Sequence, residues 1–268
     1  MPSQSKLAAQ QLAKKLKLEE QVKPDLRRLF KKIAKDINVI WVATNNIPSL
    51  ESFKPELITL LRDHYRRVEK KFSKTLRMDG KGYELLLEKK QDNQEETDNS
   101  ISHAIMAYIL THSVLQSQYI LDTTQKELQS IVAHQAMQSA MAEIPQSSIE
   151  MGNAIKSEFE AASTNRIDTI ALTETQMAAE TMKHIEAGIL ALALLTQSEQ
   201  LISTWHATLD SRTRPAHAYA HGQEVPQGIP FHVGGEQLLY PGDSSLGASL
   251  GNIINCRCSS ITTVKSLL

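Results

Sequence analysis

The chain has 268 residues, with 29 basic and 30 acidic side chains and a formal net charge of −1. This length allows one large domain or two modest ones. The near-neutral charge excludes a protein that binds nucleic acid over its whole surface, and two cysteines exclude a disulfide scaffold. The longest apolar run, 187–195, is far shorter than the roughly twenty residues that span a bilayer, and the first residues lack the apolar core of a secretion signal.

Charge and glycine are unevenly distributed along the chain. Residues 1–36 carry ten basic and four acidic side chains, whereas residues 201–268 carry four of each. Seven of the eleven glycines and four of the nine prolines lie in 201–268, and both residue types break helices and form turns. We therefore predict a mainly α fold, with a long helical N-terminal body and a small Gly/Pro-rich α+β C-terminal domain. Its segments are a basic helical N-terminal region (1–100), a helical body (101–200) and a tail domain (201–268).

The first region is predicted to contain two helices. Apolar residues recur every three or four positions over 25–41, with Pro24 in the first helical turn and basic side chains on the opposite face. A second helix is expected over 56–76, and a turn at 79–82 would end it. Residues 91–100 include no apolar side chain, which is typical of a solvated loop or a hinge.

A long helix, or two in line, is predicted over 101–143. This stretch is polar but carries little charge, and Pro145 would end it. Two interpretations are open for its uncharged surface. The helix packs inside its own domain, or one face is covered by a partner subunit, because the cores of interfaces are depleted of charge.

The next part of the body is also predicted to be helical. Ser147 or Ser148 is suited to cap a helix, with Glu150 just beyond. The last helix is expected over 166–200. Residues 187–195 are apolar on all sides, so we expect this end of the helix to be buried.

The basic side chains of residues 1–36 have three possible uses. Lysine and arginine on one helix face pair with DNA phosphates and release counterions. They equally suit an acidic protein surface, or serve only to keep an amphipathic helix soluble. No aromatic residues that would stack on bases are interleaved with them, and no motif that reads DNA is present.

The tail segment concentrates the residue types that bind metals. It holds both cysteines and four of the nine histidines, which are His206, His217, His221 and His232. Cys256 and Cys258 are two apart, so both would face one side of a strand. His217 and His221 are four apart and would share a face if 213–221 is helical. Thiolates and imidazoles are the ligands that tetrahedral zinc takes.

Other roles remain open for these residues. C-x-C is a less common zinc spacing than C-x-x-C, and cysteine is often simply buried. A disulfide between Cys256 and Cys258 would close a strained, very small ring. Asp210 is a further ligand candidate, or it caps a helix or pairs with Arg212 or Arg214.

The sequence gives little support for catalysis. It contains no G-x-S-x-G elbow and no phosphate-binding loop of the Walker type. Gly234-Gly235 and the segment 241–243 read as turns. A metal-dependent hydrolase that uses Asp210, His217 and Glu174 is the alternative from the enzyme class.

A series of short motifs over residues 166–262 resembles the minor head morphogenesis proteins of tailed phages and prophages, the group that includes the F protein of phage Mu. Each motif is weak alone, but all of them occur in order. They are the segment 170–175 (IALTET), Trp205, the segment 210–214 (DSRTR), His217, Gly222-Gln223, Pro230-Phe231, Gly234-Gly235, the segment 240–243 (YPGD) and the segment 255–258 (NCRC). His221 departs from the pattern, because an Asp or Asn commonly precedes this glycine in the family.

The resemblance implies a structural role in the virion and not an enzyme. Such proteins are minor capsid components, associated with the portal vertex or the head interior, and assist procapsid assembly or DNA packaging and delivery. Assembly would take place in the host cytoplasm, with several copies per particle and with portal protein and other head proteins as partners. The recurring motifs imply a shared zinc site of Asp210, His217, Cys256 and Cys258.

Two rivals to this interpretation remain. One is a metal-dependent hydrolase or nuclease built on Asp210, His217, Cys256 and Cys258. The other is a scaffold-binding module without metal.

Overall fold

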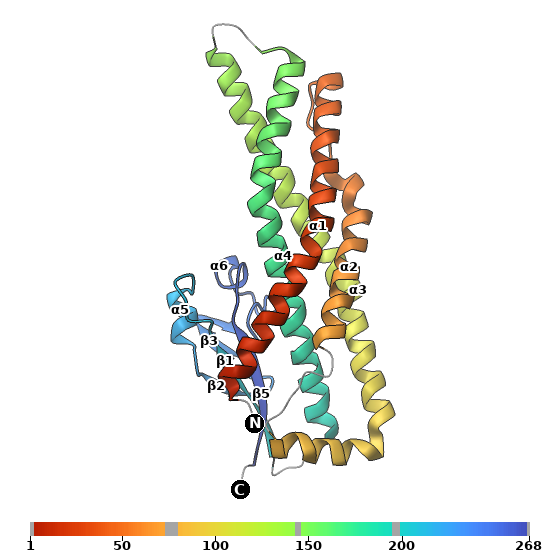
Figure 1. Ribbon diagram of the computed structural model, residues 1–268, viewed down its shortest axis with the longest axis vertical. Coiled ribbons are helices and arrows are strands. Elements are labelled where there is room, and N and C mark those ends of the chain that lie inside the picture. Colours follow the sequence, from red (N-terminus) through yellow and green to blue (C-terminus); the bar gives the residue numbers. More distant parts are fainter. Residues whose placement is uncertain (1–2, 73–79, 143–145, 195–198, 267–268) are drawn as a thin grey trace. The chain divides into compact units, whose positions relative to one another are not determined.

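The computed structural model describes residues 3–72, 80–142, 146–194 and 199–266, with the backbone alone at 80–94, 193–194 and 266. The chain is mainly helical, with a few antiparallel strands near its C-terminus, which confirms the predicted fold class (Figure 1). The long helices are α1 (Gln4–Thr44), α2 (Lys54–Phe72), α3 (Gly80–Met141) and α4 (Ser148–Leu194), and a short 3-10 helix η1 (Leu50–Phe53) precedes α2. Among the described residues, no helix combines the length and the apolar character needed to cross a membrane.

Short strands and short helices make up the rest of the chain. In order they are β1 (Glu199–His206), α5 (Pro215–Tyr219), β2 (Glu224–Pro226), β3 (Phe231–Val233), β4 (Glu236–Leu238), α6 (Leu250–Ile253) and β5 (Ser259–Ser266). β1 pairs antiparallel with β2 on one side and β5 on the other, and β3 and β4 form a hairpin. Gly234 and Gly235 make the predicted hairpin turn with φ of 62° and 83°, a left-handed conformation that favours glycine.

The chain forms two compact units that share the long helices. The helical unit comprises Glu20–His64 and Leu110–Ala171, and the mixed unit comprises Met1–Glu19, Tyr65–Ile109 and Leu172–Leu268. This division differs from the predicted segments 1–100, 101–200 and 201–268. The reason is that each long helix runs through both units, so neighbouring residues of one helix belong to different cores.

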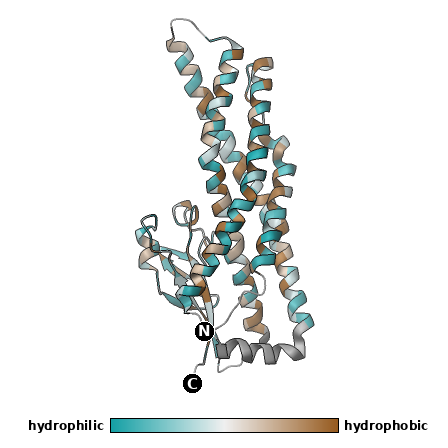
Figure 2. Cartoon of the chain, in the orientation of Figure 1, coloured by the Kyte–Doolittle hydropathy of each residue, from teal (hydrophilic) through white to brown (hydrophobic). Residues whose placement is uncertain are grey.

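The helical unit is held together by amphipathic helices, whose alternating polar and apolar stripes are visible in Figure 2. The apolar face predicted over 25–41 is buried at Leu26, Phe30 and Ile33. The Phe30 ring stacks on Phe159 of α4, with ring centroids 6.1 Å apart. The basic side chains Arg27, Arg28, Lys31, Lys32 and Lys35 are exposed on the opposite face, as predicted.

Two predictions about the helices are wrong, namely where the first helix begins and where a loop interrupts the helical body. Pro24 lies inside α1, not in its first turn, because α1 begins at Gln4. An internal proline removes one hydrogen bond from the helix. Packing of the helix offsets this loss, because Leu18 and Val22, in the two turns before Pro24, are both 2% exposed. Residues 91–100, predicted as a loop or hinge, are helical within α3. Glutamine and glutamate favour helix, so a polar stretch does not by itself indicate a loop.

Three further boundaries also differ from the prediction. Residues 80–82 open α3 instead of forming a turn, and residues 199–200 belong to β1 instead of the last helix. Residues 148–194 form one continuous helix, and the Leu192 side chain near its end is 90% exposed, although we expected a buried end. Some positions used in the predictions lie outside the described residues. They are 73–76, Asp79, Pro145 and Leu195.

The predicted cap of α4 is confirmed. Ser147 Oγ accepts a hydrogen bond from the Glu150 N–H, and the Glu150 carboxylate accepts from the Ser147 N–H at 2.8 Å. This reciprocal arrangement is a capping box, which satisfies backbone donors at the start of a helix.

Candidate metal centre

Three of the four predicted ligands meet at one point in the mixed unit. His217 of α5 and the two cysteines that precede β5 are buried, and their ligand atoms all lie within 4.8 Å of one another. His217 Nδ1 is 3.3 Å from Cys258 Sγ and 3.7 Å from Cys256 Sγ. A tetrahedral zinc ion with ordinary Zn–N and Zn–S bonds would hold nitrogen and sulfur about 3.6 Å apart. Both nitrogen-to-sulfur distances are therefore close to those of a zinc site.

Local backbone structure brings these side chains together. Pro215 stands at the first position of α5, where its missing N–H costs nothing, and sets the start of the turn that carries His217. Asn255 adopts a left-handed conformation with φ of 58° and turns the chain out of α6. Cys256 and Cys258 follow in a loop and not in the predicted strand, which begins only at Ser259.

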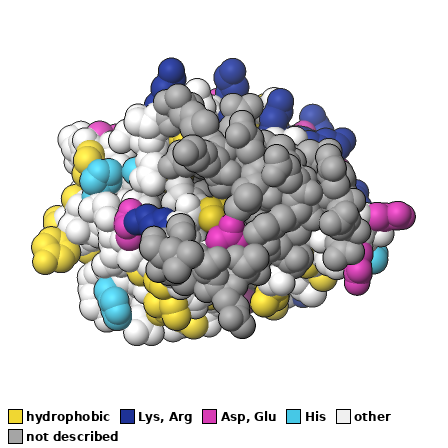
Figure 3. All heavy atoms as spheres, turned by 90° about the horizontal axis from the view of Figure 1, so that it is seen from below, with side chains coloured by type: hydrophobic (Ala, Val, Ile, Leu, Met, Phe, Trp, Pro, Cys, Tyr) yellow, Lys and Arg dark blue, Asp and Glu magenta, His cyan; other side chains and the backbone are white. Residues whose placement is uncertain are grey.

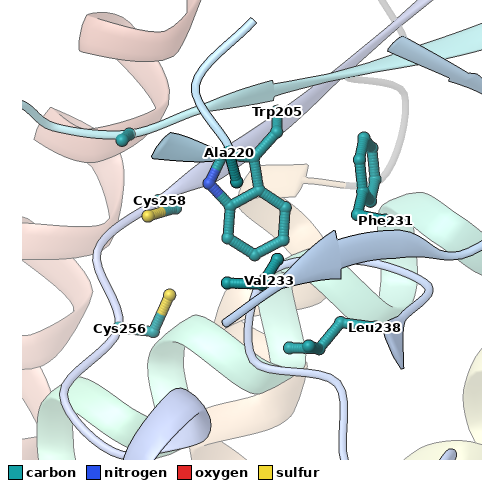
Figure 4. Close-up of a cluster of buried hydrophobic side chains, with 8 residues drawn as sticks. Trp205, Ala220, Phe231, Val233, Leu238, Cys256 and Cys258 are labelled. Carbon is teal, nitrogen blue, oxygen red and sulfur yellow. The ribbon is translucent and has the colours of Figure 1, made fainter. Parts of the chain in front are cut away.

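The cysteines lie within the apolar core of the tail. Trp205, Phe231, Val233 and Leu238 pack around them, and the indole nitrogen of Trp205 lies on the side of Cys258 (Figure 4). Trp205 meets Phe231 edge to face at 5.3 Å between ring centroids. Both cysteines are therefore buried among apolar side chains.

The tautomer of His217 is fixed by Asn252 of α6. The Asn252 amide nitrogen donates to the Val233 carbonyl (3.2 Å) and to the Glu236 carboxylate (2.6 Å). Its Oδ1 must therefore accept the hydrogen bond from His217 Nε2, at 3.2 Å. A proton on Nε2 leaves the lone pair on Nδ1, which faces the two sulfurs. Such an outer partner is what a metal-binding histidine requires.

The two thiols are electrostatically coupled. A hydrogen bond from Cys258 is the main reason that the pKa of Cys256 lies well below its ordinary value, with His217 adding to the effect against burial. The same interaction with Cys256, together with burial, raises the pKa of Cys258. The lowered pKa of Cys256 favours its thiolate, the form that binds metals.

Asp210 does not belong to this group of ligands. Arg257, between the two cysteines, donates to both of its oxygens, Nη1 to Oδ2 at 2.6 Å and Nη2 to Oδ1 at 2.5 Å. The Arg212 N–H adds a hydrogen bond to Oδ1 at 3.0 Å. Both Asp210 oxygens take part in this bidentate pair, and Asp210 is not among the residues whose ligand atoms meet at one point. Asp210 instead fixes the Cys256–Cys258 loop from outside through Arg257.

The remaining candidates lie elsewhere. α5 ends at Tyr219, so His221 does not share a helix face with His217. The Nδ1 atom of His221 accepts a hydrogen bond from the Ala207 N–H. The rings of His221 and His206 pack edge to face, with centroids 5.5 Å apart. The side chain of His232 is exposed. Glu174, considered for a hydrolase, is buried on α4 and accepts a hydrogen bond from Tyr65 at 2.5 Å.

The loop that carries the cysteines is held from the inside by residues that the sequence analysis missed. Gln176 Nε2 of α4 donates to the Cys258 carbonyl at 2.8 Å and is 4.0 Å from Cys256 Sγ. Lys15 Nζ of α1 donates to the same carbonyl and to Ser259 Oγ, each at 3.0 Å. Lys15 is 1% exposed, so a side chain of α1 lies buried beside the loop that carries the cysteines.

Lys15 belongs to a buried ionic network. Glu180 accepts hydrogen bonds from Lys15 at 2.6 Å, from Lys183 at 2.8 Å, and from the N–H and Oγ of Ser260 at 3.0 and 2.7 Å. Burial favours the neutral form of Glu180, but the two ammonium groups outweigh it and lower its pKa to about 2. Burial lowers the pKa of Lys183 to about 8.

One signal in the sequence could have indicated Lys15. It lies at helical spacing from Leu7, Gln11, Leu18 and Val22, all of which are buried. A charged residue on an apolar face calls for a buried partner. Asn252 and Gln176 carry no such signal, because their role depends on contacts between distant segments.

Comparison with known proteins identifies no relative: no family model, no curated protein and no solved structure matches this chain.

Proposed function

We propose that the protein is a structural component of a tailed-phage head, a minor capsid or head morphogenesis protein, and not an enzyme. The observation that carries this proposal is the convergence of the sequence motifs that resemble that family. They are spread over residues 170–258, and they meet around the Cys256–Cys258 loop.

The contacts between motifs are specific. Thr173 of the IALTET segment accepts a hydrogen bond from the Asn255 N–H of the NCRC segment at 3.2 Å. Asp210 of the DSRTR segment holds Arg257 of the same NCRC segment. Tyr240 of the YPGD segment accepts at 3.2 Å from Thr181 of α4, six residues beyond the IALTET segment. Motifs that depend on one another in space support one shared structural module more strongly than separate matches do.

A zinc ion bound by His217, Cys256 and Cys258 would tie this module together. It would join α5 to the loop before β5, which otherwise depends on short elements with few backbone hydrogen bonds. Structural zinc sites contribute folding free energy directly. The geometry supports a metal with nitrogen and sulfur ligands, and zinc is the metal that this donor set favours.

The surface of the helical unit suits a role in an assembly. Arg27, Arg28, Lys31 and Lys35 form an exposed basic face on α1, and Figure 3 shows that basic side chains gather along one edge of the face it draws. α3 has no charged residue from Asn99 to Leu121 but exposes Leu115 at 67%. We propose portal protein and other head proteins as partners, in several copies at the portal vertex or inside the head, with DNA or an acidic protein surface meeting the basic face.

Copurification tests the partner proposal. The protein would be produced together with a tailed-phage portal protein from the same source and captured through the portal protein. The pair Lys31→Glu and Lys35→Glu should reduce capture, whereas Lys70→Glu with Lys126→Glu, an equal charge change at exposed positions of α2 and α3, should not. Absence of capture for the unaltered chain, or equal loss with both pairs, would contradict the proposal.

Elemental analysis tests the metal. The purified chain should contain about one zinc per molecule, and Cys256→Ser and His217→Ala should each lose it. Asp210→Asn should keep it, because Asp210 contacts Arg257 and not the ligand group. Zinc loss in Asp210→Asn, with the fold intact by circular dichroism, would restore Asp210 as a ligand.

A further inference from the structure

The metal centre has three ligands from this chain, whereas tetrahedral zinc takes four. All nine histidines and both cysteines lie among the described residues, and only His217, Cys256 and Cys258 form a group with metal-ligand spacing there. The nearest predicted carboxylate, Asp210, has both oxygens occupied by Arg257. Within the described residues, this chain therefore supplies three of the four donors.

A small cavity provides a place for the fourth donor. It borders on all three ligand residues, and its volume open to water is about 10 Å³. A single water molecule needs a space of roughly 10–15 Å³ by this measure. The cavity thus accommodates one donor atom beside the ligands, and no bulky side chain.

The charges around the cavity favour an anion. Arg212, Arg214 and Arg257 line it, and no Asp or Glu of the described part of the chain does. Arg257 is neutralised by Asp210, and Arg214 donates to the Ile254 carbonyl. Arg212 is the most exposed of the three, with 73% of its side chain exposed and its guanidinium 3.8 Å from Asp210. A metal ion and an arginine at one opening attract a small anionic donor.

We infer that the metal held by His217, Cys256 and Cys258 keeps an open fourth coordination position, which faces the arginine-lined cavity and takes one exchangeable donor. Water fills it in the isolated protein, and a monodentate anion replaces water. This inference rests on the proposed metal site. A structural zinc site is normally closed by four protein ligands, so an open position gives this centre a second capacity, which is to bind an external anionic group.

Cobalt substitution tests the open position. The full chain would be stripped of metal, loaded with Co²⁺ and titrated with azide while the visible absorption bands are recorded. Thiolate-to-cobalt bands that vanish in Cys256→Ser would assign the metal to this site. We expect azide to shift the ligand-field bands in a saturable way, because it replaces water on the metal.

Matched variants locate the effect. Arg212→Gln should weaken azide binding by about two- to fivefold, the size expected for one exposed charge. Lys70→Gln removes an exposed charge from α2 and should leave azide binding unchanged.

Each outcome has a distinct meaning. Co²⁺ bound through both cysteines but indifferent to azide would overturn the open position and leave the proposed metal site standing. Failure to bind either Zn²⁺ or Co²⁺ would overturn both the metal site and this inference.

Discussion

The buried network around Glu180 makes a sharp prediction about stability. Glu180 lies between two lysines, and the side chains of Lys15, Glu180 and Lys183 are 2%, 0% and 6% exposed. Glu180→Gln keeps the size of the side chain but removes the only negative charge of this triad. Two ammonium groups would then remain buried without a counter-charge.

The magnitude follows from the contacts. Glutamine Oε1 can still accept from the lysines, but its amide group would then face the Ser260 N–H, which places a donor against a donor. Removing one partner of a buried ion pair costs about 3–5 kcal/mol. Whole domains have about 5–15 kcal/mol of stability. We therefore expect Glu180→Gln to remove a large part of the stability of the mixed unit.

Urea unfolding at neutral pH measures this loss. Trp205 is fully buried in the mixed unit, so its fluorescence in a Trp41→Phe background reports on that unit alone. The matched control is Glu56→Gln, which breaks a Lys32–Glu56 pair of the same 2.6 Å length whose side chains are 56% and 43% exposed. An exposed pair contributes about 0–1 kcal/mol, and circular dichroism would follow this change in the helical unit.

Two outcomes would refute the reasoning. One is a loss in Glu180→Gln no larger than that in Glu56→Gln. The other concerns the double variant with Lys15→Met, which removes one of the two uncompensated ammonium groups. Its loss should be smaller than the sum of the two single losses by about 0.5–3 kcal/mol, the usual coupling between residues in contact. Strict additivity would show that the charges do not interact.

Burial raises the pKa of Glu174 from 4.5 to about 7 against the hydrogen bond from Tyr65. The stability that the protonated Glu174 contributes is therefore fully present below pH 4.5 and is lost as the pH rises through about 7. The free energy of unfolding of Glu174→Gln, measured in urea, should therefore depend less on pH over this range than that of the unaltered chain. Asn252→Leu removes the acceptor that orients His217 and should weaken zinc binding about 10- to 100-fold in competition with a chelating dye; unchanged affinity would exclude this orienting role. Ser147→Ala removes the cap of α4 and should cost about 1 kcal/mol by circular dichroism, with Ser148→Ala as the control; equal costs would contradict the assigned cap.

Local patterns in the sequence predicted the features that depend on neighbouring residues. The apolar face of α1 follows from helical periodicity, the capping box from two residues three apart, and the glycine turn of the β3–β4 hairpin from the need for positive φ. Each of these depends on a few adjacent positions, so the sequence contains the whole physical cause.

Features that depend on distant segments could not be predicted in this way. The composition of residues 91–100 suggested a loop, but backbone hydrogen bonds continue through them and favour the helix. The candidate ligand Asp210 was chosen by residue type, whereas its bidentate contact with Arg257 comes from a loop near the end of the chain. Lys15 was counted with the solvated basic side chains, although its partners lie on α4 and beside β5.

The contacts of Lys15 also bear on the order in which the two units fold while the chain is being synthesised. Between Lys15 and its acceptor Cys258 the ribosome has to add 243 residues, which takes about 12–50 s at the usual rate of about 5–20 residues per second. The helical unit has all its residues once Ala171 has been synthesised, so it can fold well before the mixed unit. During this interval the lysine at position 15 and the apolar residues around it have no tail to pack against. The loop that carries Cys256 and Cys258 is made last, and its contacts complete the burial of Lys15.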